Sequence, residues 1–187
     1  MKYALGVDIG GTKISVVLGN SRGKILAKQT LPTRVGREAP LAIRELTQAL
    51  TGLKRRVPKN GPLLGIGIGV PGPMDPSKGV IQRSPHLKGW QRFPLIEFFE
   101  KRLKIPVFAA NDANAAVLGE KVFGNGRKTN NLIYITISTG IGAGIIADGR
   151  LLNGVSYGAG EFGHTIVVPE GERCGCGHLG CLEAYSS

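Results

Sequence analysis

Glycines are concentrated at the ends of the short apolar runs in this chain, and this placement limits the possible folds more than any other feature. The 187 residues include 29 glycines, and they form no flexible linker. A fold with many tight turns between short strands is the expected result. At the start of the chain the pattern predicts an antiparallel meander, with strands at residues 5–9, 14–18 and 24–30.

Segments with helical spacing alternate with further strands along the rest of the chain. Apolar residues recur at helical spacing over residues 40–56, which predicts a helix that covers one face of the sheet. A buried strand is predicted at residues 64–70. Helices follow at 94–104 and 112–123, with a strand at 105–110 between them. Alternation of this kind is typical of an α/β architecture.

Residues 131–152 repeat the pattern seen at the start of the chain. An apolar strand at 132–137 is followed by a turn rich in glycine and hydroxyl groups, and then by a second strand that runs through Ile146. A duplicated fold would present two such β-hairpins. Chance similarity is the alternative, because glycine-rich hairpin turns are common.

Charge and hydropathy argue against two classes of partner. The formal charge of +11 would attract polyanions, but the lysines and arginines are scattered and are not interleaved with aromatic residues as a nucleic-acid platform requires. No apolar stretch approaches the roughly 20 residues of a membrane-spanning helix. Asp8 interrupts the segment in which a signal peptide keeps an apolar core. We therefore expect a cytoplasmic protein with neither a nucleic-acid nor a membrane partner.

Two glycine-rich turns have the composition of a phosphate-binding site. Residues 8–13 read DIGGTK, which combines a carboxylate at a strand end, two glycines whose N–H groups can approach phosphate oxygens, a hydroxyl and a cation. Residues 138–144 read STGIGAG and form the matching second turn. Neither is a Walker P-loop, because the ending that opens a helix is absent. An ordinary hairpin turn is the alternative for each segment.

Asp112 is the candidate catalytic residue. It belongs to the segment NDAN at residues 111–114, which follows a predicted strand and begins a predicted helix. The carboxyl ends of strands are where α/β proteins build their sites, and a carboxylate there could take a proton from a hydroxyl group. Asp and Asn are also preferred helix N-caps, so a purely structural role for Asp112 stays open.

The cysteines of the chain indicate a metal site. All three lie within residues 174–181, and their odd number and close spacing do not suit a disulfide framework. Together with one histidine they supply the ligands of a tetrahedral structural zinc site. His164 and His178 are the rival nitrogen ligands, and the residues alone leave the choice open.

Two glutamates, Glu161 and Glu183, stand near these ligands in the sequence. A loop braced by a metal would hold their carboxylates in fixed positions, where they could accept hydrogen bonds from the hydroxyl groups of a sugar. A surface charge without a ligand is the alternative for each glutamate.

Taken together, these segments resemble the ROK family of repressors, open reading frames and kinases, and within it the bacterial and archaeal glucokinases. The resemblance rests on DIGGTK at 8–13, GVPGP at 69–73, NDAN at 111–114, TGIGAG at 139–144, GEFGH at 160–164 and CGCGHLGCLE at 174–183. It implies an α/β fold of the actin-like ATPase (ribonuclease H-like) type, with two lobes around a ligand cleft. The expected lobes are residues 1–117 and 118–187, the second carrying the zinc-binding loop and incomplete at its C-terminal end.

The resemblance also implies an activity, the ATP-dependent phosphorylation of a hexose, with glucose and its 6-phosphate as the first choice. Asp112 would act as general base, Asp8 would help to position Mg²⁺, and zinc would brace the sugar site. The positions that match ATP-binding loops are Asp8, Gly10, Gly11, Thr12, Lys13, Thr139 and Gly140. The positions that match sugar contacts are Gly72, Asn111, Asp112, Glu161, His164 and Glu183. The positions that match zinc ligands are His164, Cys174, Cys176 and Cys181.

Three alternatives accompany this expectation. A kinase of the same family acting on N-acetylmannosamine, fructose or another hexose would carry the same motifs. A sugar-responsive repressor would need a helix-turn-helix segment, for which the residues ahead of Asp8 leave no room. Family members continue beyond residue 187, so an inactive sugar-binding fragment is the third alternative. A homodimer is expected of the full-length form.

Overall fold

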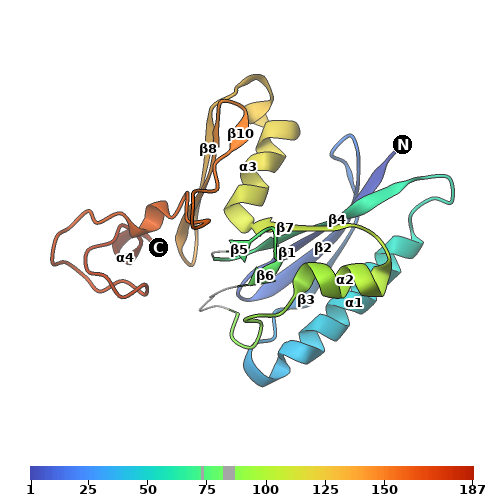
Figure 1. Cartoon of the computed structure of the whole chain (residues 1–187), viewed down its shortest axis with the longest axis horizontal. Helices are drawn as coiled ribbons and strands as arrows, with labels where there is room; N and C mark the ends of the chain where they lie inside the picture. Colours follow the sequence, from blue (N-terminus) through green and yellow to red (C-terminus); the bar gives the residue numbers. More distant parts are fainter. Residues whose placement is uncertain (73, 82–86) are drawn as a thin grey trace. The chain divides into compact units, whose positions relative to one another are not determined.

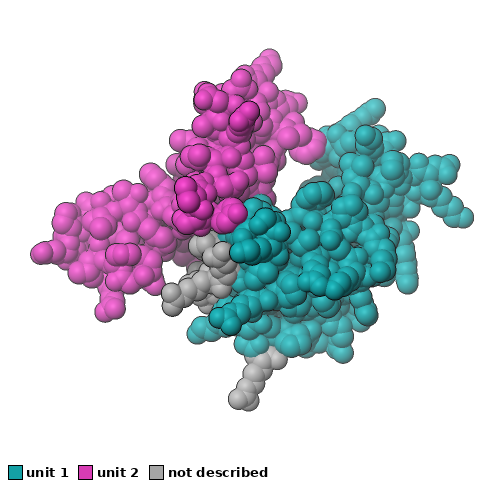
Figure 2. All heavy atoms as spheres, in the orientation of Figure 1, with its two compact units in different colours: residues 1–112 teal, residues 113–187 magenta. Residues whose placement is uncertain are grey.

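The computed structural model describes residues 1–72, 74–81 and 87–187, and it divides into two compact units (Figure 2). Unit 1 comprises Met1–Asp112 and unit 2 comprises Ala113–Ser187. In the described residues no helix is long and apolar enough to cross a membrane. The lobe boundary expected after residue 117 stays a prediction.

Unit 1 is built on a five-stranded sheet in the order β3-β2-β1-β4-β7. Its strands are β1 (Tyr3–Ile9), β2 (Lys13–Asn20), β3 (Ile25–Pro32), β4 (Leu63–Val70) and β7 (Val107–Asn111). The first three pair in antiparallel fashion, which confirms the predicted meander, whereas β4 and β7 extend the sheet in parallel to β1. The strands β1, β4 and β7 therefore end at the same edge of the sheet.

Two helices pack on one face of this sheet, α1 (Ala39–Arg55) and α2 (Leu95–Leu103) (Figure 1). A single turn, η1 (Gly36–Glu38), precedes α1. The side chains of Leu46 and Leu50 in α1 are fully buried, and they share one apolar core with alternate residues of the strands. The predicted helix at residues 40–56 and the α/β architecture are thereby confirmed.

Small or polar residues lie on the opposite face of the sheet near the ends of β1 and β4. Alternation along β1 and β4 turns Gly6, Asp8 and Gly67 away from the apolar core. Asp8 and Gly67 are exposed. Asp8 lies beside Gly69 of β4, and because glycine has no side chain, this neighbour leaves the carboxylate accessible.

Three strands of two residues each were beyond what the sequence pattern can predict. β5 (Met74–Asp75) pairs with β6 (Val80–Ile81), and β10 (Arg150–Leu151) extends the sheet of unit 2. Two residues are too few to show an alternation that takes about four positions to recognise. The Asp75 carboxylate holds the turn after β5, since it accepts hydrogen bonds from the Ser77 N–H over 2.9 Å and from the Ser77 hydroxyl over 2.6 Å.

Unit 2 contains a three-stranded antiparallel sheet in the order β10-β9-β8. β8 (Leu132–Ile137) and β9 (Ile141–Ala147) form the hairpin predicted in this region, which is thereby confirmed. The helix α3 (Asp112–Val122) packs on one face of the sheet, and a short turn, η2 (Asn125–Lys128), follows it (Figure 1). Gly144 permits this packing, because a Cβ there would lie 2.3 Å from the Ala113 carbonyl oxygen.

The remainder of unit 2, residues 152–187, has little regular structure. It contains one 3-10 turn, η3 (Phe162–His164), and the short helix α4 (Glu183–Ser186). Isolated bridges, such as the one between Ile166 and Cys181, replace extended ladders. Cys174 and Cys181 are buried, so the cysteines form the centre of this segment.

Candidate functional site

The carboxyl edge of the parallel strands in unit 1 gathers several of the predicted site residues. Asp8 lies one residue before the end of β1, Gly72 follows β4, and Asn111 ends β7. The Asn111 side-chain amide donates a hydrogen bond to the Gly72 carbonyl over 3.4 Å, which ties two of these strand ends together. Asp112 comes next and is the first residue of α3.

Pro73, the end of the predicted loop at 71–73, lies outside the described residues.

The turn between β1 and β2 is held in shape by hydrogen bonds. The Gly10 N–H donates to the Lys13 carbonyl over 2.9 Å. Thr33, just past β3, donates from its hydroxyl to the Gly10 carbonyl over 2.6 Å and from its N–H to the Thr12 carbonyl over 3.0 Å. Among the described residues, the N–H groups of Gly11 and Thr12 have no hydrogen-bond partner, and both residues are exposed. The turn thus presents two adjacent N–H donors, an arrangement that binds anions such as phosphate.

The turn between β8 and β9 has the same property. The Ser138 N–H donates to the Gly140 carbonyl over 2.9 Å, and the Ile141 N–H donates to the Glu183 carboxylate over 2.8 Å. Within the described part of the chain, the N–H groups of Thr139 and Gly140 donate no hydrogen bond. Each unit therefore offers one turn with two adjacent main-chain donors, and a side chain distant in the sequence holds each turn.

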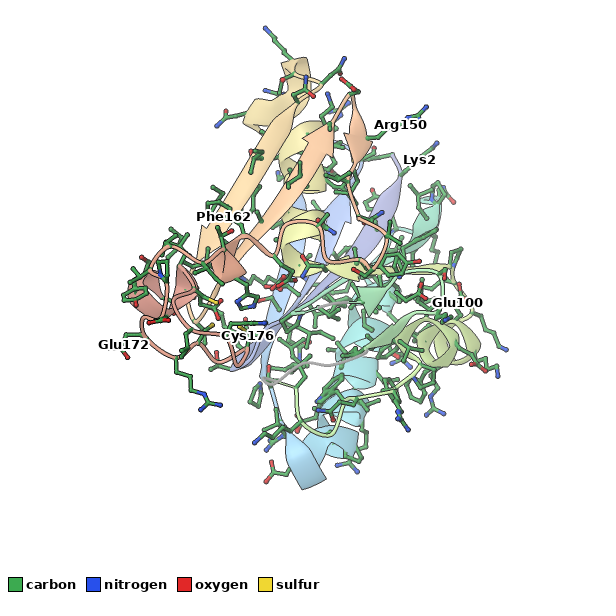
Figure 3. All side chains as sticks on the ribbon, turned by 60° about the vertical axis from the view of Figure 1, so that its left-hand side comes forward. Lys2, Glu100, Arg150, Phe162, Glu172 and Cys176 are labelled. Carbon is green, nitrogen blue, oxygen red and sulfur yellow. The ribbon has the colours of Figure 1, made fainter. Side chains whose placement is uncertain are left out.

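Four side chains of unit 2 form a candidate metal centre, which we call the metal set: His164, Cys174, Cys176 and Cys181. Their ligand atoms all lie within 4.8 Å of one another, and Cys176 is labelled in Figure 3. The Cys176 and Cys181 sulfurs are 3.7 Å apart, and the Cys174 sulfur is 3.7 Å from His164 Nδ1. These separations fit zinc, because a tetrahedron with metal–ligand distances of about 2.1–2.3 Å has edges of about 3.4–3.8 Å.

The geometry favours one of the two candidate histidines. His164 belongs to the metal set, whereas His178 does not, although its Nδ1 atom lies 3.4 Å from the Cys176 sulfur. His164 turns its Nδ1 atom to the sulfurs, and its Nε2 atom lies 3.7 Å from a Glu161 carboxylate oxygen. A carboxylate near the outer nitrogen commonly orients a metal-binding histidine.

The cysteines of the metal set differ in acidity. Hydrogen bonds from the main chain and the side chain of His178 lower the pKa of Cys176 to about 6. Burial raises the pKa of Cys181 to about 12, and the neighbouring Cys176 and Cys174 side chains add to this effect. Without metal, the exposed Cys176 is therefore a thiolate at neutral pH while the buried Cys181 keeps its proton. A metal that binds the set has to displace that proton.

The predicted site residues fall into two groups, one in each unit. Unit 1 holds Asp8, Gly10, Gly11, Thr12, Lys13, Gly72, Asn111 and Asp112. Unit 2 holds Thr139, Gly140, Glu161, His164, Glu183 and the three cysteines. Sequence reasoning does not single out Thr33, because its bond to the first turn joins residues 23 positions apart. The one signal in the sequence is a hydroxyl residue directly after the third strand of the meander.

Comparison with solved structures defines the class of fold. A ROK family glucokinase from Streptomyces griseus, solved in complex with glucose and AMPPNP, matches with a TM-score of 0.81 and 37% sequence identity. The match covers 99% of this chain and 57% of that chain. The fold is therefore an α/β domain of the actin-like ATPase type.

The family follows from the sequence comparisons. The family model described as ROK family matches residues 4–187, and the chain belongs to this family. It is 42% identical over 183 residues to a glucokinase from Thermotoga maritima, covering 98% of this chain and 56% of the relative. It is 36% identical over 184 residues to a xylose repressor from Caldicellulosiruptor bescii, covering 98% of this chain and 46% of the relative. The chain thus spans about half the length of these relatives.

Proposed function

We propose that this chain is part of an ATP-dependent hexose kinase and that its hexose is glucose. The likeness to a glucokinase, and to a structure solved with glucose and AMPPNP, supports the proposal. The observation that carries it is the carboxyl edge of unit 1, where β1 supplies Asp8 and leads into the turn at residues 10–13, and β7 leads into Asp112, with β4 between these two strands. Phosphoryl transfer to a hydroxyl group needs a phosphate-binding turn and a base near each other.

In the proposed reaction Asp112 acts as the general base. The C6 hydroxyl of the hexose gives its proton to the Asp112 carboxylate while its oxygen forms a bond to the γ-phosphorus of ATP. The bond from that phosphorus to the β,γ-bridging oxygen breaks, and ADP leaves. Asn111, which donates to the Gly72 carbonyl, would contact the sugar beside the base.

Each of the two turns would bind phosphate oxygens of ATP. The turn at residues 10–13 and the turn at 138–140 each offer two adjacent main-chain donors, which are already oriented and so need little rearrangement. Lys13 would add positive charge. Asp8 would help to hold Mg²⁺, which neutralises charge on phosphate oxygens when bound.

The metal set would hold zinc, which acts as a structural brace when bound. The set suits this ion because it combines three sulfurs and one nitrogen within 4.8 Å of one another, with two of the separations at 3.7 Å. Beside this brace, Glu161, His164 and Glu183 would bind sugar hydroxyls. A site whose polar groups are all paired with hydroxyls discriminates strongly against ligands that lack them.

A sugar-responsive repressor is the second candidate function, and the 36% identity to a xylose repressor favours it. Such a protein needs the sugar site but no phosphoryl transfer. The two candidates therefore differ in the role of Asp112, which is a base in the kinase and at most a sugar contact in the repressor.

Release of ADP in the presence of ATP, Mg²⁺ and a panel of hexoses tests the proposal. We expect release that depends on hexose and is fastest with glucose, from this chain or from a longer chain extended to the length of the relatives. Glucose binding without ADP release by the longer chain would overturn the kinase in favour of the repressor. Faster ADP release with N-acetylmannosamine or fructose would show that the substrate is that sugar and not glucose, while the proposed phosphoryl transfer would stand. Light scattering of the longer chain tests the homodimer that is expected of the full-length form.

A further inference from the structure

Glu183 makes a contact that its proposed role as a sugar ligand does not require. Its Oε2 atom accepts a hydrogen bond from the Ile141 N–H over 2.8 Å. Ile141 is the first residue of β9, and its N–H belongs to the peptide that follows Gly140. Fixing this peptide also restricts the directions of the neighbouring N–H groups in the turn at 138–140. The contact therefore helps to set the shape of a turn that would bind phosphate.

Gly140 shows how closely the carboxylate is seated on this turn. A Cβ at that position would lie 2.6 Å from Glu183 Oε2, which is well inside van der Waals contact. Gly140 does not have a positive φ. The turn therefore favours glycine at this position because a side chain would collide with the carboxylate, and not because the backbone adopts a left-handed conformation.

The same glutamate is tied to the metal set by two routes. Its second oxygen, Oε1, lies 3.9 Å from the Cys174 sulfur. Along the chain, the fully buried Cys181 precedes Glu183 by two residues, and the Leu182 N–H between them donates to the Thr165 carbonyl over 2.9 Å. A metal bond to Cys181 would therefore restrain the main chain from which the Glu183 side chain projects.

We infer that Glu183 is a positioning residue that couples the metal set to the turn at 138–140. With zinc bound, the carboxylate is held against the Ile141 N–H, and the turn keeps the shape that presents its two donors. Without zinc, the segment that carries Glu183 loosens. The hydrogen bond from the Ile141 N–H to the Glu183 carboxylate, which we call the clamp, then opens. The inference rests on the proposed function only where it takes phosphate as the ligand of the turn. The clamp itself does not depend on that function, because all of its residues belong to unit 2.

Amide hydrogen exchange at Ile141, followed by NMR, tests the clamp directly. In the zinc-loaded chain this amide should exchange slowly, because a bonded N–H exchanges only when its bond opens. Removing zinc with EDTA should speed its exchange by about tenfold or more. The Gly144 amide lies in the interior of the β8–β9 ladder, and its exchange should change by less than about twofold if the hairpin stays folded.

Variants from both sides of the contact separate the clamp from general loosening. Glu183→Ala removes the acceptor, so Ile141 should exchange fast with or without zinc. Glu183→Gln keeps an acceptor oxygen and should retain part of the protection. Gly140→Ala displaces the carboxylate while the metal set stays intact, and it should also release Ile141. Gly142→Ala is its matched control, because a Cβ there lies no closer than 3.6 Å to another part of the described chain.

Three results would overturn the inference. The first is an Ile141 exchange rate that is the same with and without zinc, and the second is an unchanged rate in Glu183→Ala. The third is equal acceleration of Ile141 and Gly144 on zinc removal, because that result means that the whole hairpin unfolds. If Glu183→Ala does not fold, Gly140→Ala decides alone.

Nucleotide binding on the same samples keeps this inference distinct from the proposed function. Zinc should raise the affinity of the unmodified chain for AMPPNP in the presence of Mg²⁺, and this dependence should disappear in Gly140→Ala. If no sample binds AMPPNP, the proposed function fails for this chain, while the exchange of the Ile141 amide still decides whether the clamp exists.

Discussion

At the scale of single residues, the proposed chemistry depends on the Asp112 carboxylate. Replacing it by an amide removes the proton acceptor and changes the size of the side chain little. We expect Asp112→Asn to keep its melting temperature and to lose about 10²–10⁴-fold in the rate of hexose-dependent ADP release. The assay uses whichever chain length is active. Unchanged turnover would refute the role of base and leave the N-cap as the function of this residue.

Thr33 braces the first turn, and its hydroxyl can be removed with little change in shape. Thr33→Val loses the hydrogen bond to the Gly10 carbonyl and keeps the N–H bond to Thr12. We expect AMPPNP with Mg²⁺ to bind about 5- to 10-fold more weakly, as loss of one neutral hydrogen bond predicts. Calorimetry measures the affinity. Thr51→Val is the matched control, because the Thr51 hydroxyl donates to the Thr47 carbonyl inside α1, and an equal loss there would contradict the bracing role.

Cys176 and Cys181 should differ in reactivity once zinc is removed. His178 lowers the pKa of the exposed Cys176 to about 6, so its alkylation should be fast at neutral pH and slow down as the pH falls through about 6 and the thiolate is protonated. Burial raises the pKa of Cys181 to about 12, so this thiol should stay protonated and react at least about 100-fold more slowly.

Mass spectrometry of peptides from the iodoacetamide-treated chain, sampled from about pH 5 to pH 8, measures this difference. Zinc should protect both cysteines, because bonding to the metal occupies the sulfur lone pairs. Equal labelling of Cys176 and Cys181 in the metal-free chain would contradict the assigned acidities.

At the scale of elements, β8 presents an open edge and an apolar face. Among the described strands it pairs with β9 alone, and Ile133, Ile135 and Ile137 are 61%, 48% and 66% exposed. The Ala143 N–H points away from β8, to the Gly160 carbonyl, so its partner Ile135 turns its own N–H and carbonyl to the open edge. The same alternation applies to the other two isoleucines. Uncharged, exposed edge strands of this kind pair with further strands.

We expect the chain to self-associate by antiparallel pairing of β8 with β8 of a second copy, centred on Ile135. Ile135→Lys would bring two like charges together and should weaken the association by about tenfold or more. Light scattering as a function of protein concentration measures this. Val122→Lys is the matched control, because Val122 is an apolar residue of α3 with 57% exposure and is not on a strand edge. A chain that stays monomeric, or equal effects of the two variants, would refute the pairing.

At the scale of the whole molecule, the two units draw their stability from different sources. Unit 1 has a continuous apolar core, whereas residues 152–187 have little regular structure around the metal set. Because metal binding supplies folding free energy in such segments, removing zinc should loosen this part of unit 2 and leave unit 1 folded.

Limited trypsin digestion tests this division. Without zinc, cleavage after Arg173 should become about tenfold faster or more, because cleavage follows the population of the open segment. Cleavage after Lys54, whose ammonium group donates to the Leu103 carbonyl over 2.5 Å, should keep its rate. Mass spectrometry of the fragments over time gives both rates. Equal acceleration at the two sites would show that zinc supports the whole chain.

The sequence by itself determined the features that depend on neighbours along the chain. The meander, α1 and the β8–β9 hairpin were predicted because apolar alternation, helical spacing and glycine turns are local patterns. The cysteine cluster indicated a metal for the same reason, since three of the four ligands lie within eight consecutive residues. Strands of two residues escaped prediction because so short a segment shows no period.

Only the tertiary structure decided which distant residues meet. It placed His164 in one set with all three sulfurs, whereas His178 lies beside the Cys176 sulfur but outside this set, and it brought Thr33 to the first turn and Glu183 to the second. These two contacts join residues 23 and 42 positions apart. Such contacts form when packing and strand pairing close long loops. A pattern of neighbouring residues does not show which distant residues such a loop closure will bring into contact.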